Sequence, residues 1–373
     1  MAEKRAKYIE EIATKERKAA ILNLAKNLAP GKRIALVGHD SPDADYFGSF
    51  AAFKHYFTKV AGIEAVDSFA VFGGESILQN QVIEKFLGID LKDQKFYEGS
   101  SELYGANIFL DTSEVHTSLK IKPDIIFDHH KESETPVDGC FTIYEAVGAS
   151  CTMTYVLLGG GLGVKFPQEI LVGLALGITL DTRSLQDEGT KKVDRWALKE
   201  IVSQMDEDHY QLYLYYSYFP PVSFGSIQRR GRAFAGAENE NGIVFAFLGE
   251  TDSSEDNSYG VIADELIRVR GAEIAIVSGI RGEKFEKVAV RVNSETLGYE
   301  KILKDVFKTD FYSRESEISS GGRSTSAGGA LIPLTSFEKG QCKNKDKKEG
   351  FLLDKKSQRI SDLKRFVADK SSN

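Results

Sequence analysis

This 373-residue sequence has few cysteines, no long apolar run and no excess of positive charge. Its three cysteines (Cys140, Cys151 and Cys342) are odd in number and lack the paired spacing of a zinc site, so they fit a protein of a reducing cytosol. No run approaches the roughly 18 apolar residues that indicate a membrane span. The stretch from Met1 to Lys18 is charged throughout, unlike a signal peptide. We therefore expect a cytoplasmic protein without a membrane-bound part.

The balance of charge excludes another class. The chain has 48 lysines and arginines against 55 aspartates and glutamates, a formal net charge of −7. Proteins that hold long nucleic acids without sequence preference usually carry a basic face, and this chain does not have one in bulk. A small anionic substrate held by a few local cations is compatible with the composition. The length suits two domains.

Polar clusters follow the apolar segments of the first half. A continuous apolar strand from Arg33 to Gly38 leads into His39-Asp40-Ser41-Pro42-Asp43-Ala44-Asp45 and then a helix. Strand, polar loop and helix in this order place side chains above the carboxyl edge of an open α/β sheet. One imidazole and two carboxylates within seven residues need a cation among them. The alternative is that Asp43 or Asp45 only caps the helix.

Three further segments end in the same way. The apolar run Asp124–Phe127 reads as a buried strand and ends at Asp128-His129-His130, where the alternative is a capped strand end with solvated histidines. The strand 106–110 ends at Asp111, and the buried helix 167–180 ends at Asp181. Folding alone explains none of the four clusters.

Together the clusters predict one site with mixed carboxylate and imidazole ligands. Such ligands favour two divalent cations, Mn²⁺ first and Mg²⁺ second, over structural zinc. Two ions can hold a bridging hydroxide and clamp the attacking and leaving oxygens of a phosphoryl transfer. Asp111, from a central strand, is the predicted bridging carboxylate. The predicted metal ligands are His39, Asp43, Asp45, Asp111, His129 and Asp181.

These motifs resemble the DHH phosphoesterase superfamily across residues 32–185. The pattern is H-x-x-P-D-x-D, a strand-end aspartate, D-H-H and G-I-x-x-D-T, found here at His39–Asp45, Asp111, Asp128–His130 and Gly177–Thr182. The resemblance implies a mostly parallel sheet flanked by helices, a smaller α/β C-terminal domain, and an active cleft between them. The predicted fold class is therefore α/β.

The resemblance also implies roles for the residues of the site. One metal would bind His39, Asp43 and Asp111, and the second would bind Asp45, Asp111, His129 and Asp181. His130 would face the scissile phosphate as a donor or proton carrier. Asp128 would orient the histidines from behind. The implied catalytic residues are His130, Asp128 and Asp111.

A glycine-rich stretch in the second half, Ser319-Ser-Gly-Gly-Arg-Ser-Thr-Ser-Ala-Gly-Gly329, suits a phosphate or nucleotide edge, or is simply a flexible turn. In position it resembles the substrate loop G-G-G-G-H-x-x-A-A-G of the DHH-associated C-terminal domain. Serines replace two glycines at 319 and 320, Arg323 replaces the histidine, and Ser326 replaces an alanine. Arg291 matches the family arginine that precedes this loop. The predicted substrate-binding residues are Arg291, Gly321, Gly322, Arg323 and Ser324.

The predicted organisation has four parts. Residues 1–29 form one amphipathic helix that packs or makes a homodimer. Residues 30–221 form the metal-binding domain, and its tyrosine-rich end (210–221) packs as a connector or, alternatively, stacks bases. Residues 222–340 form the substrate-binding domain. Residues 341–373 form a solvated, charged tail with a short helix near 360–368.

We expect a Mn- or Mg-dependent phosphodiesterase or phosphatase, a hydrolase acting on phosphoester bonds. Its expected substrates are short oligonucleotides or small nucleotides, as for a nano-RNase, a phosphoadenosine phosphate phosphatase or a dinucleotide phosphodiesterase. RecJ-like enzymes carry extra nucleic-acid-binding domains, which we do not expect here. One alternative is a family II pyrophosphatase or exopolyphosphatase, against which the glycine-rich stretch argues. The other is a non-catalytic nucleotide-binding protein, against which the full set of ligands argues.

Overall fold

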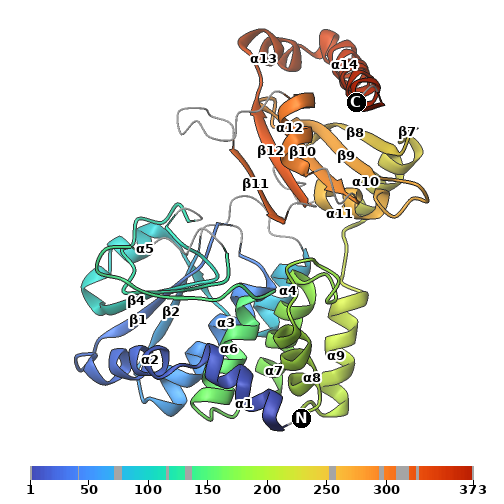
Figure 1. Ribbon diagram of the computed structural model, residues 1–373. Helices are drawn as coiled ribbons and strands as arrows, with labels where there is room; N and C mark the ends of the chain where they lie inside the picture. The colour runs from blue at the N-terminus through green and yellow to red at the C-terminus, as the bar shows by residue number, and fades with distance from the viewer. Residues whose placement is uncertain are drawn as a thin grey trace. The chain divides into compact units, whose positions relative to one another are not determined.

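The computed structural model describes residues 2–40, 42–70, 78–114, 117–130, 137–251, 258–293, 298–307, 319–324 and 327–371. The chain divides into two compact units, Met1–Pro221 and Val222–Asn373, each with its own sheet and core (Figure 1). Within the described residues, no helix is both long enough and apolar enough to cross a membrane.

A six-stranded parallel sheet organises the first unit. Its strand order is β3-β2-β1-β4-β5-β6, so the order reverses between β1 and β4. In open α/β sheets, ligands bind at the carboxyl ends of the strands beside such a reversal. The strands are β1 (Arg33–Val37), β2 (Val66–Phe69), β3 (Leu91–Lys92), β4 (Tyr104–Leu110), β5 (Ile125–Asp128) and β6 (Phe141–Tyr144). The predicted α/β class is confirmed.

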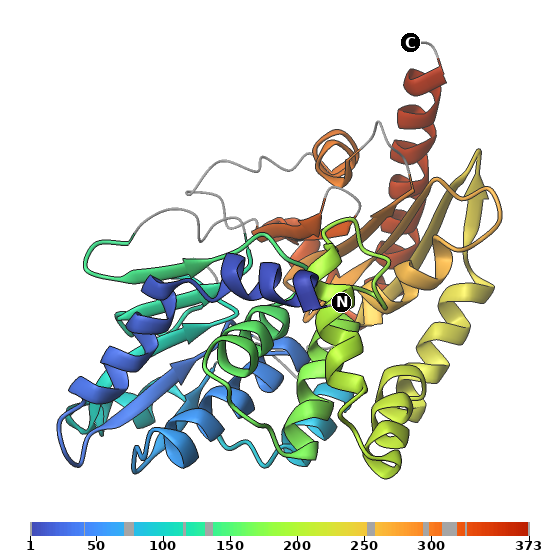
Figure 2. The ribbon, with the colours of Figure 1, turned by 60° about the horizontal axis from the view of Figure 1, so that its bottom comes forward.

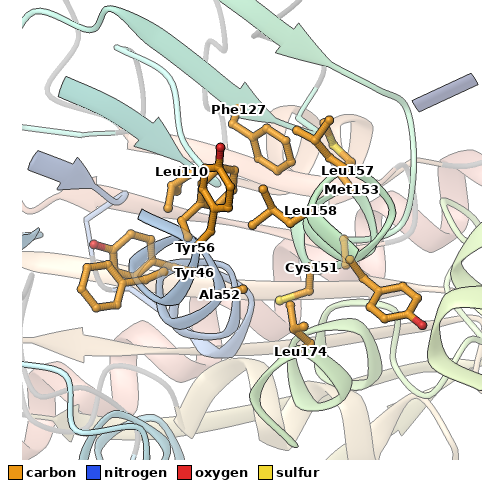
Figure 3. Packing of buried hydrophobic residues seen from close by; sticks show 14 of the residues in the cluster. Tyr46, Ala52, Tyr56, Leu110, Phe127, Cys151, Met153, Leu157, Leu158 and Leu174 are labelled. Carbon is orange, nitrogen blue, oxygen red and sulfur yellow. The ribbon is translucent and has the colours of Figure 1, made fainter. Parts of the chain in front are cut away.

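Both faces of this sheet are buried, as the near-continuous apolar strands require. In β1, Ile34 and Leu36 face the large core, whereas Ala35 and Val37 face a smaller core on the opposite side. Figure 3 shows the large core, where Leu110 and Phe127 of the sheet lie near Leu158 and Met153. The helices of the unit are α1 (Ala2–Ile12), α2 (Lys15–Asn27), α3 (Ala44–His55), α4 (Leu78–Phe86), α5 (Gln94–Glu98), α6 (Ser150–Thr154), α7 (Gln168–Asp181), α8 (Lys192–Val202) and α9 (Glu207–Tyr218), with π-helical turns at Tyr56–Val60 and Tyr155–Gly161 and a 3₁₀ turn at Ser101–Leu103.

The N-terminal segment forms two helices where one was expected (Figure 2). The first helix ends at Ile12, and Thr14 caps the second, because its hydroxyl accepts a hydrogen bond of 3.2 Å from the backbone N–H of Arg17. Ile12 and Ala13, at the break, are buried in the core of the same unit. Whether these helices also form a homodimer stays a prediction.

The tyrosine-rich stretch forms most of α9. Tyr213 is its buried member, and its hydroxyl lies 2.9 Å from Thr179 Oγ1 of α7. This residue therefore packs the helix onto the core, as a connector would.

A charge network joins residues of four strands of the first unit, β1 to β4. Asp67 of β2 bonds Lys92 Nζ at 2.5 Å, Tyr104 Oη at 2.8 Å and Arg33 Nη1 at 3.1 Å. Burial by itself would raise the pKa of Asp67, but hydrogen bonds from Lys92 and Tyr104 lower it below its usual range. The carboxylate therefore stabilises the fold while it is ionised.

Replacing Asp67 by asparagine is expected to lower the free energy of unfolding by about 2 kcal/mol near neutral pH, since Lys92 and Arg33 lose their counter-charge. The folded pKa lies below the unfolded value of about 3.9, so this stabilisation is complete above that value and is lost as pH falls through the folded pKa. Denaturant unfolding of both proteins at about pH 7 and about pH 3 measures the difference. An equal difference at the two pH values would contradict the assignment.

The second unit is built on a mixed sheet of order β11-β12-β10-β9-β8-β7, in which β8 and β9 are parallel and the other pairs antiparallel. Its strands are β7 (Glu238–Glu240), β8 (Ile243–Thr251), β9 (Ile274–Arg281), β10 (Phe285–Val292), β11 (Ser319–Ser324) and β12 (Ala327–Pro333). Its helices are α10 (Phe224–Ala235), α11 (Ser258–Leu266), α12 (Tyr299–Phe307), α13 (Ser336–Lys343) and α14 (Lys345–Ser371).

The segment expected to be a solvated tail contains the long helix α14, shown in red in Figure 2. Its Arg359 and Lys355 are buried against Glu286 of β10, itself fully buried. The Arg359 guanidinium donates to both Glu286 oxygens, at 2.8 and 2.5 Å, and Lys355 Nζ lies 3.4 Å away. A carboxylate buried in a sheet needs such partners, so the charge that suggested solvation instead attaches the helix.

Candidate metal centre

Each predicted ligand stands at the end of an element of the first unit. His39 follows β1, Asp111 follows β4, and Asp128 ends β5 with His129 directly after it. Asp43 and Asp45 begin α3, and Asp181 ends α7. Because parallel strands present their carboxyl ends at one edge, β1 and β4 bring their side chains together at the strand-order reversal.

The backbone is strained at two of these ends. Asp111 has a φ of 54°, in the left-handed region that side chains other than asparagine and aspartate rarely occupy. Beginning two residues after Asp181, the residues Arg183, Ser184 and Leu185 have φ values of 48°, 57° and 65°. Strain of this kind is retained where the surrounding structure holds a functional geometry.

The two histidines adopt the same arrangement. His39 Nδ1 lies 2.9 Å from the carbonyl oxygen of Asp40, and His129 Nδ1 lies 3.0 Å from that of Val147. A carbonyl only accepts, so each Nδ1 carries a hydrogen, and in the neutral form of the ring each Nε2 has its lone pair. This is the usual orientation of metal-binding histidines.

Both Nε2 atoms point at carboxylates. His129 Nε2 lies 3.3 Å from Asp181 Oδ2, 3.4 Å from Asp111 Oδ1 and 3.8 Å from Asp45 Oδ2. It is buried and makes no hydrogen bond within the described part of the chain. A lone pair facing three carboxylate oxygens is favourable only with positive charge between them, so these residues fit a divalent cation.

Asp111 lies between the two groups. Its Oδ2 is 3.5 Å from His39 Nε2, while its Oδ1 is 3.4 Å from His129 Nε2. Among the described residues, His39, Asp43 and Asp111 can share one ion, and Asp45, His129 and Asp181 can share another. One oxygen toward each group is the geometry expected of a bridging carboxylate.

Asp45 is held by the amino end of α6. Its two oxygens accept hydrogen bonds from the backbone N–H groups of Ser150, at 2.6 Å, and Cys151, at 2.8 Å. The side chain of Ser150 donates to Asp111 Oδ1 at 3.2 Å. The sequence reasoning missed these residues, since only backbone amides and one small hydroxyl are involved.

The capping interpretation of Asp43 holds for one of its oxygens. Asp43 Oδ1 accepts the backbone N–H of Asp45 at 3.0 Å and caps α3. The same oxygen lies 3.9 Å from His39 Nε2. The cap therefore orients the carboxylate toward His39, and the two roles are compatible.

Asp128 lies behind the histidines, buried at the end of β5. Its Oδ1 is 2.8 Å from His130 Nδ1 and also accepts the backbone N–H groups of His129 (2.8 Å) and His130 (3.3 Å). Burial by itself would raise the pKa of Asp128, but the hydrogen bond from His130 lowers it. An ionised Asp128 fixes the hydrogen of His130 on Nδ1, which assigns any proton exchange to Nε2.

The carboxylates of the centre repel one another, and their charges shift the pKa values of the residues there. Burial and the nearby charges of Asp111 and Asp181 raise the pKa of Asp45 well above its usual range. Burial by itself would lower the pKa of His129, but the close carboxylates of Asp111 and Asp181 raise it well above its usual range. Added positive charge would relieve the repulsion among the carboxylates.

Residues 33–178 match the family model described as the N-terminal domain of the DHH family. The match lies within the first unit and contains five of the six predicted ligands, His39, Asp43, Asp45, Asp111 and His129. This unit belongs to the DHH phosphoesterase superfamily. No curated protein matches the sequence.

Solved structures extend the comparison to the whole chain. An exopolyphosphatase-related protein from Bacteroides fragilis has a TM-score of 0.63 at 15% identity, covering 92% of this chain and 98% of that chain. The two share a fold. RecJ with Mn²⁺ from Thermus thermophilus has a TM-score of 0.49 at 14% identity, and the alignment covers 93% of this chain and 54% of RecJ. A putative family II inorganic pyrophosphatase from Methanococcus jannaschii has a TM-score of 0.39 at 15% identity. The alignment covers 82% of this chain and 95% of the pyrophosphatase.

The predicted substrate-binding residues all belong to the second unit. Arg291 lies in β10, where its Nε donates to Asp264 Oδ1 at 2.6 Å and its Nη1 to the carbonyl of Val290 at 3.0 Å. Asp264 therefore already holds the guanidinium, and a phosphate would share it or replace that carboxylate. The role of Arg291 stays a prediction.

The glycine-rich stretch forms a hairpin, where a loop was expected. Gly321 and Gly322 of β11 pair with Gly329 and Gly328 of β12. A Cβ on Gly328 would lie 2.2 Å from the Tyr299 ring, so this glycine allows close packing of α12 on the sheet. Arg323 and Ser324 follow in β11. Thr325 and Ser326 lie outside the described residues.

Proposed function

We propose that this chain is a hydrolase that uses two divalent cations, Mn²⁺ first and Mg²⁺ as the alternative, to cleave phosphoester bonds in short oligonucleotides or small nucleotides. The observation that carries the proposal is the pair of imidazoles whose Nε2 atoms converge on carboxylates while Nδ1 is held by a backbone carbonyl. This arrangement suits metal binding and is unfavourable without positive charge.

The proposed division of ligands follows the two groups. His39, Asp43 and Asp111 would hold one cation, and Asp45, Asp111, His129 and Asp181 the other. Bound there, the cations supply Lewis-acid activation of water and neutralise charge on the phosphoryl oxygens. Asp45 keeps its orientation through the Ser150 and Cys151 amides.

His130 is the proposed proton carrier. Asp128 holds its Nδ1 at 2.8 Å, so the ring is oriented and its Nε2 exchanges the proton with the leaving oxygen or with water. Its side chain is 26% exposed, compared with 10% for His129, which suits a residue that meets substrate rather than metal.

The proposed substrate contacts are Arg291, Gly321, Gly322, Arg323 and Ser324. A guanidinium recognises phosphate oxygens through paired hydrogen bonds, which suits Arg291 and Arg323 to a terminal phosphate. The cytoplasmic location is also a proposal, and the free thiols of Cys140, Cys151 and Cys342 agree with it.

A substrate panel tests the proposed function. With Mn²⁺, we expect the protein to release mononucleotide or phosphate from an RNA dinucleotide, phosphoadenosine phosphate or cyclic di-adenylate, and to leave pyrophosphate intact. The Asp111→Asn protein, purified in parallel, controls for contaminating nucleases. Cleavage of pyrophosphate alone would replace the proposed substrate class by that of a pyrophosphatase. Mn²⁺ and nucleotide binding without any cleavage would identify a non-catalytic binding protein.

A further inference from the structure

A second buried carboxylate lies behind the metal centre, outside the predicted ligands. Asp194 of α8 is fully buried. Its Oδ2 accepts the backbone N–H groups of Gly148, at 2.9 Å, and Lys191, at 2.6 Å, and its Oδ1 accepts the hydroxyl of Thr152 at 2.6 Å. Three donors on one buried carboxylate form a rigid connection.

The segment that Asp194 holds, residues 147–152, touches three predicted ligands. The carbonyl of Val147 lies 3.0 Å from His129 Nδ1 and so determines which nitrogen of His129 faces the centre. The amides of Ser150 and Cys151 hold both oxygens of Asp45, and the Ser150 hydroxyl donates to Asp111. A shift of this segment would therefore misplace ligands of both groups.

The space around the connection is filled. A Cβ on Gly148 would lie 2.6 Å from Thr182 Cγ2 and 2.9 Å from Asp194 Oδ2. Thr182 directly follows the predicted ligand Asp181, so the end of α7, the 147–152 segment and α8 meet at this point. Asp194 accepts hydrogen bonds from Gly148 and Thr152, which lie near the two ends of the segment.

We propose that Asp194 is a positioning residue of the metal centre: it fixes the 147–152 segment, which in turn orients His129, Asp45 and Asp111 for binding divalent cations. The inference rests on the metal binding that is part of the proposed function. It does not depend on which phosphoester is the substrate.

The experiment compares Mn²⁺ binding by the full chain and by variants at Asp194. Asp194→Ala removes all three acceptor contacts. Asp194→Asn keeps an oxygen for the two backbone amides and can donate its Nδ2 hydrogen to Thr152 Oγ1, so it is the conservative rescue variant. Asp67→Asn is the matched control, because it also neutralises a carboxylate with three hydrogen-bond partners. Asp67 is partly buried, lies in β2 and bonds none of the predicted ligands.

The readouts are the Mn²⁺ dissociation constant and the electron paramagnetic resonance spectrum of bound Mn²⁺, at a temperature where every variant is folded. We expect Asp194→Ala to weaken Mn²⁺ binding by about tenfold or more and to alter the spectrum, in the range found for residues that orient metal ligands. Asp194→Asn and Asp67→Asn should stay within about threefold of the wild type, with its spectrum, since neither is expected to displace a ligand.

Three results would overturn the inference: wild-type affinity and spectrum in Asp194→Ala, the same loss in Asp67→Asn, or no rescue by asparagine. If the alanine protein does not fold, Thr152→Val removes one of the three donors at nearly constant volume, and an unchanged Mn²⁺ affinity in that variant would also overturn it. A wild-type protein that binds Mn²⁺ and cleaves nothing would refute the proposed function and leave this inference standing.

Discussion

The Asp111→Asn protein is expected to lose at least about 1,000-fold in phosphoester turnover, or about 4 kcal/mol of transition-state stabilisation. Asp111 presents one oxygen to His39 and the other to His129, so a neutral amide weakens both proposed cation sites at once. Both the stoichiometry of bound Mn²⁺ and its affinity should fall, together with the rise in melting temperature that Mn²⁺ produces.

Asparagine is the informative substitution at this position. It has the shape of aspartate, it tolerates the left-handed backbone at φ 54°, and its amide oxygen can still accept the Ser150 hydroxyl. An alanine would add backbone strain to the loss of charge. Metal analysis, Mn²⁺ titration and steady-state kinetics on the asparagine variant therefore report on the carboxylate. Wild-type metal content together with wild-type turnover would refute the assignment of the site.

Gly177→Ala is expected to destabilise the first unit by about 3 kcal/mol and to weaken Mn²⁺ binding. A Cβ on Gly177 would lie 2.4 Å from Cys151 Sγ and 3.0 Å from Asp45 Cα and Oδ1. Helix α7 would have to move away from α3 and α6, which carry Asp45 and the amides that hold it. Figure 3 shows how closely Cys151 and Leu174 approach in this core.

Two comparisons isolate this steric effect. Adding Cys151→Ala removes the nearest clashing atom, and the double variant should recover about half of the lost stability, a coupling expected of residues in contact. Gly350→Ala, in α14 with nothing within 4 Å of the added methyl, should instead stabilise the second unit by about 0.5–1 kcal/mol through helix propensity. Denaturant unfolding measures the stability of each variant, and Mn²⁺ titration measures its affinity for the ion. A Gly177→Ala protein with wild-type stability would contradict the packing argument.

The sequence was most informative about the site where several candidate ligands lie within one short motif. His39, Asp43 and Asp45 lie within seven residues, and His129 lies in an uninterrupted D-H-H. Strands alternating with helices predict a parallel sheet, and such a sheet gathers its carboxyl ends at one edge. Six residues spread from 39 to 181 are therefore predicted to lie in one centre, and the structure does bring them together.

It was least informative where the function of a residue lies in its backbone or in a distant partner. Ser150 and Cys151 act through amides, which every residue has, and Asp194 resembles any acid in the first turn of a helix. The lysines and arginines of α14 have the composition of a solvated helix, yet Arg359 is buried on Glu286 because that carboxylate lies inside the sheet. Composition cannot reveal a partner 73 residues away.

Residue order alone was thus enough to predict the class of fold and to place the candidate ligands at one edge of the sheet, because the strands of a parallel sheet end together at that edge. Only the tertiary structure decided that Asp111 divides its oxygens between two histidines, that both imidazoles turn Nε2 inward, and that the 147–152 segment holds Asp45. These depend on distances between segments far apart in the chain, which packing sets and local sequence does not.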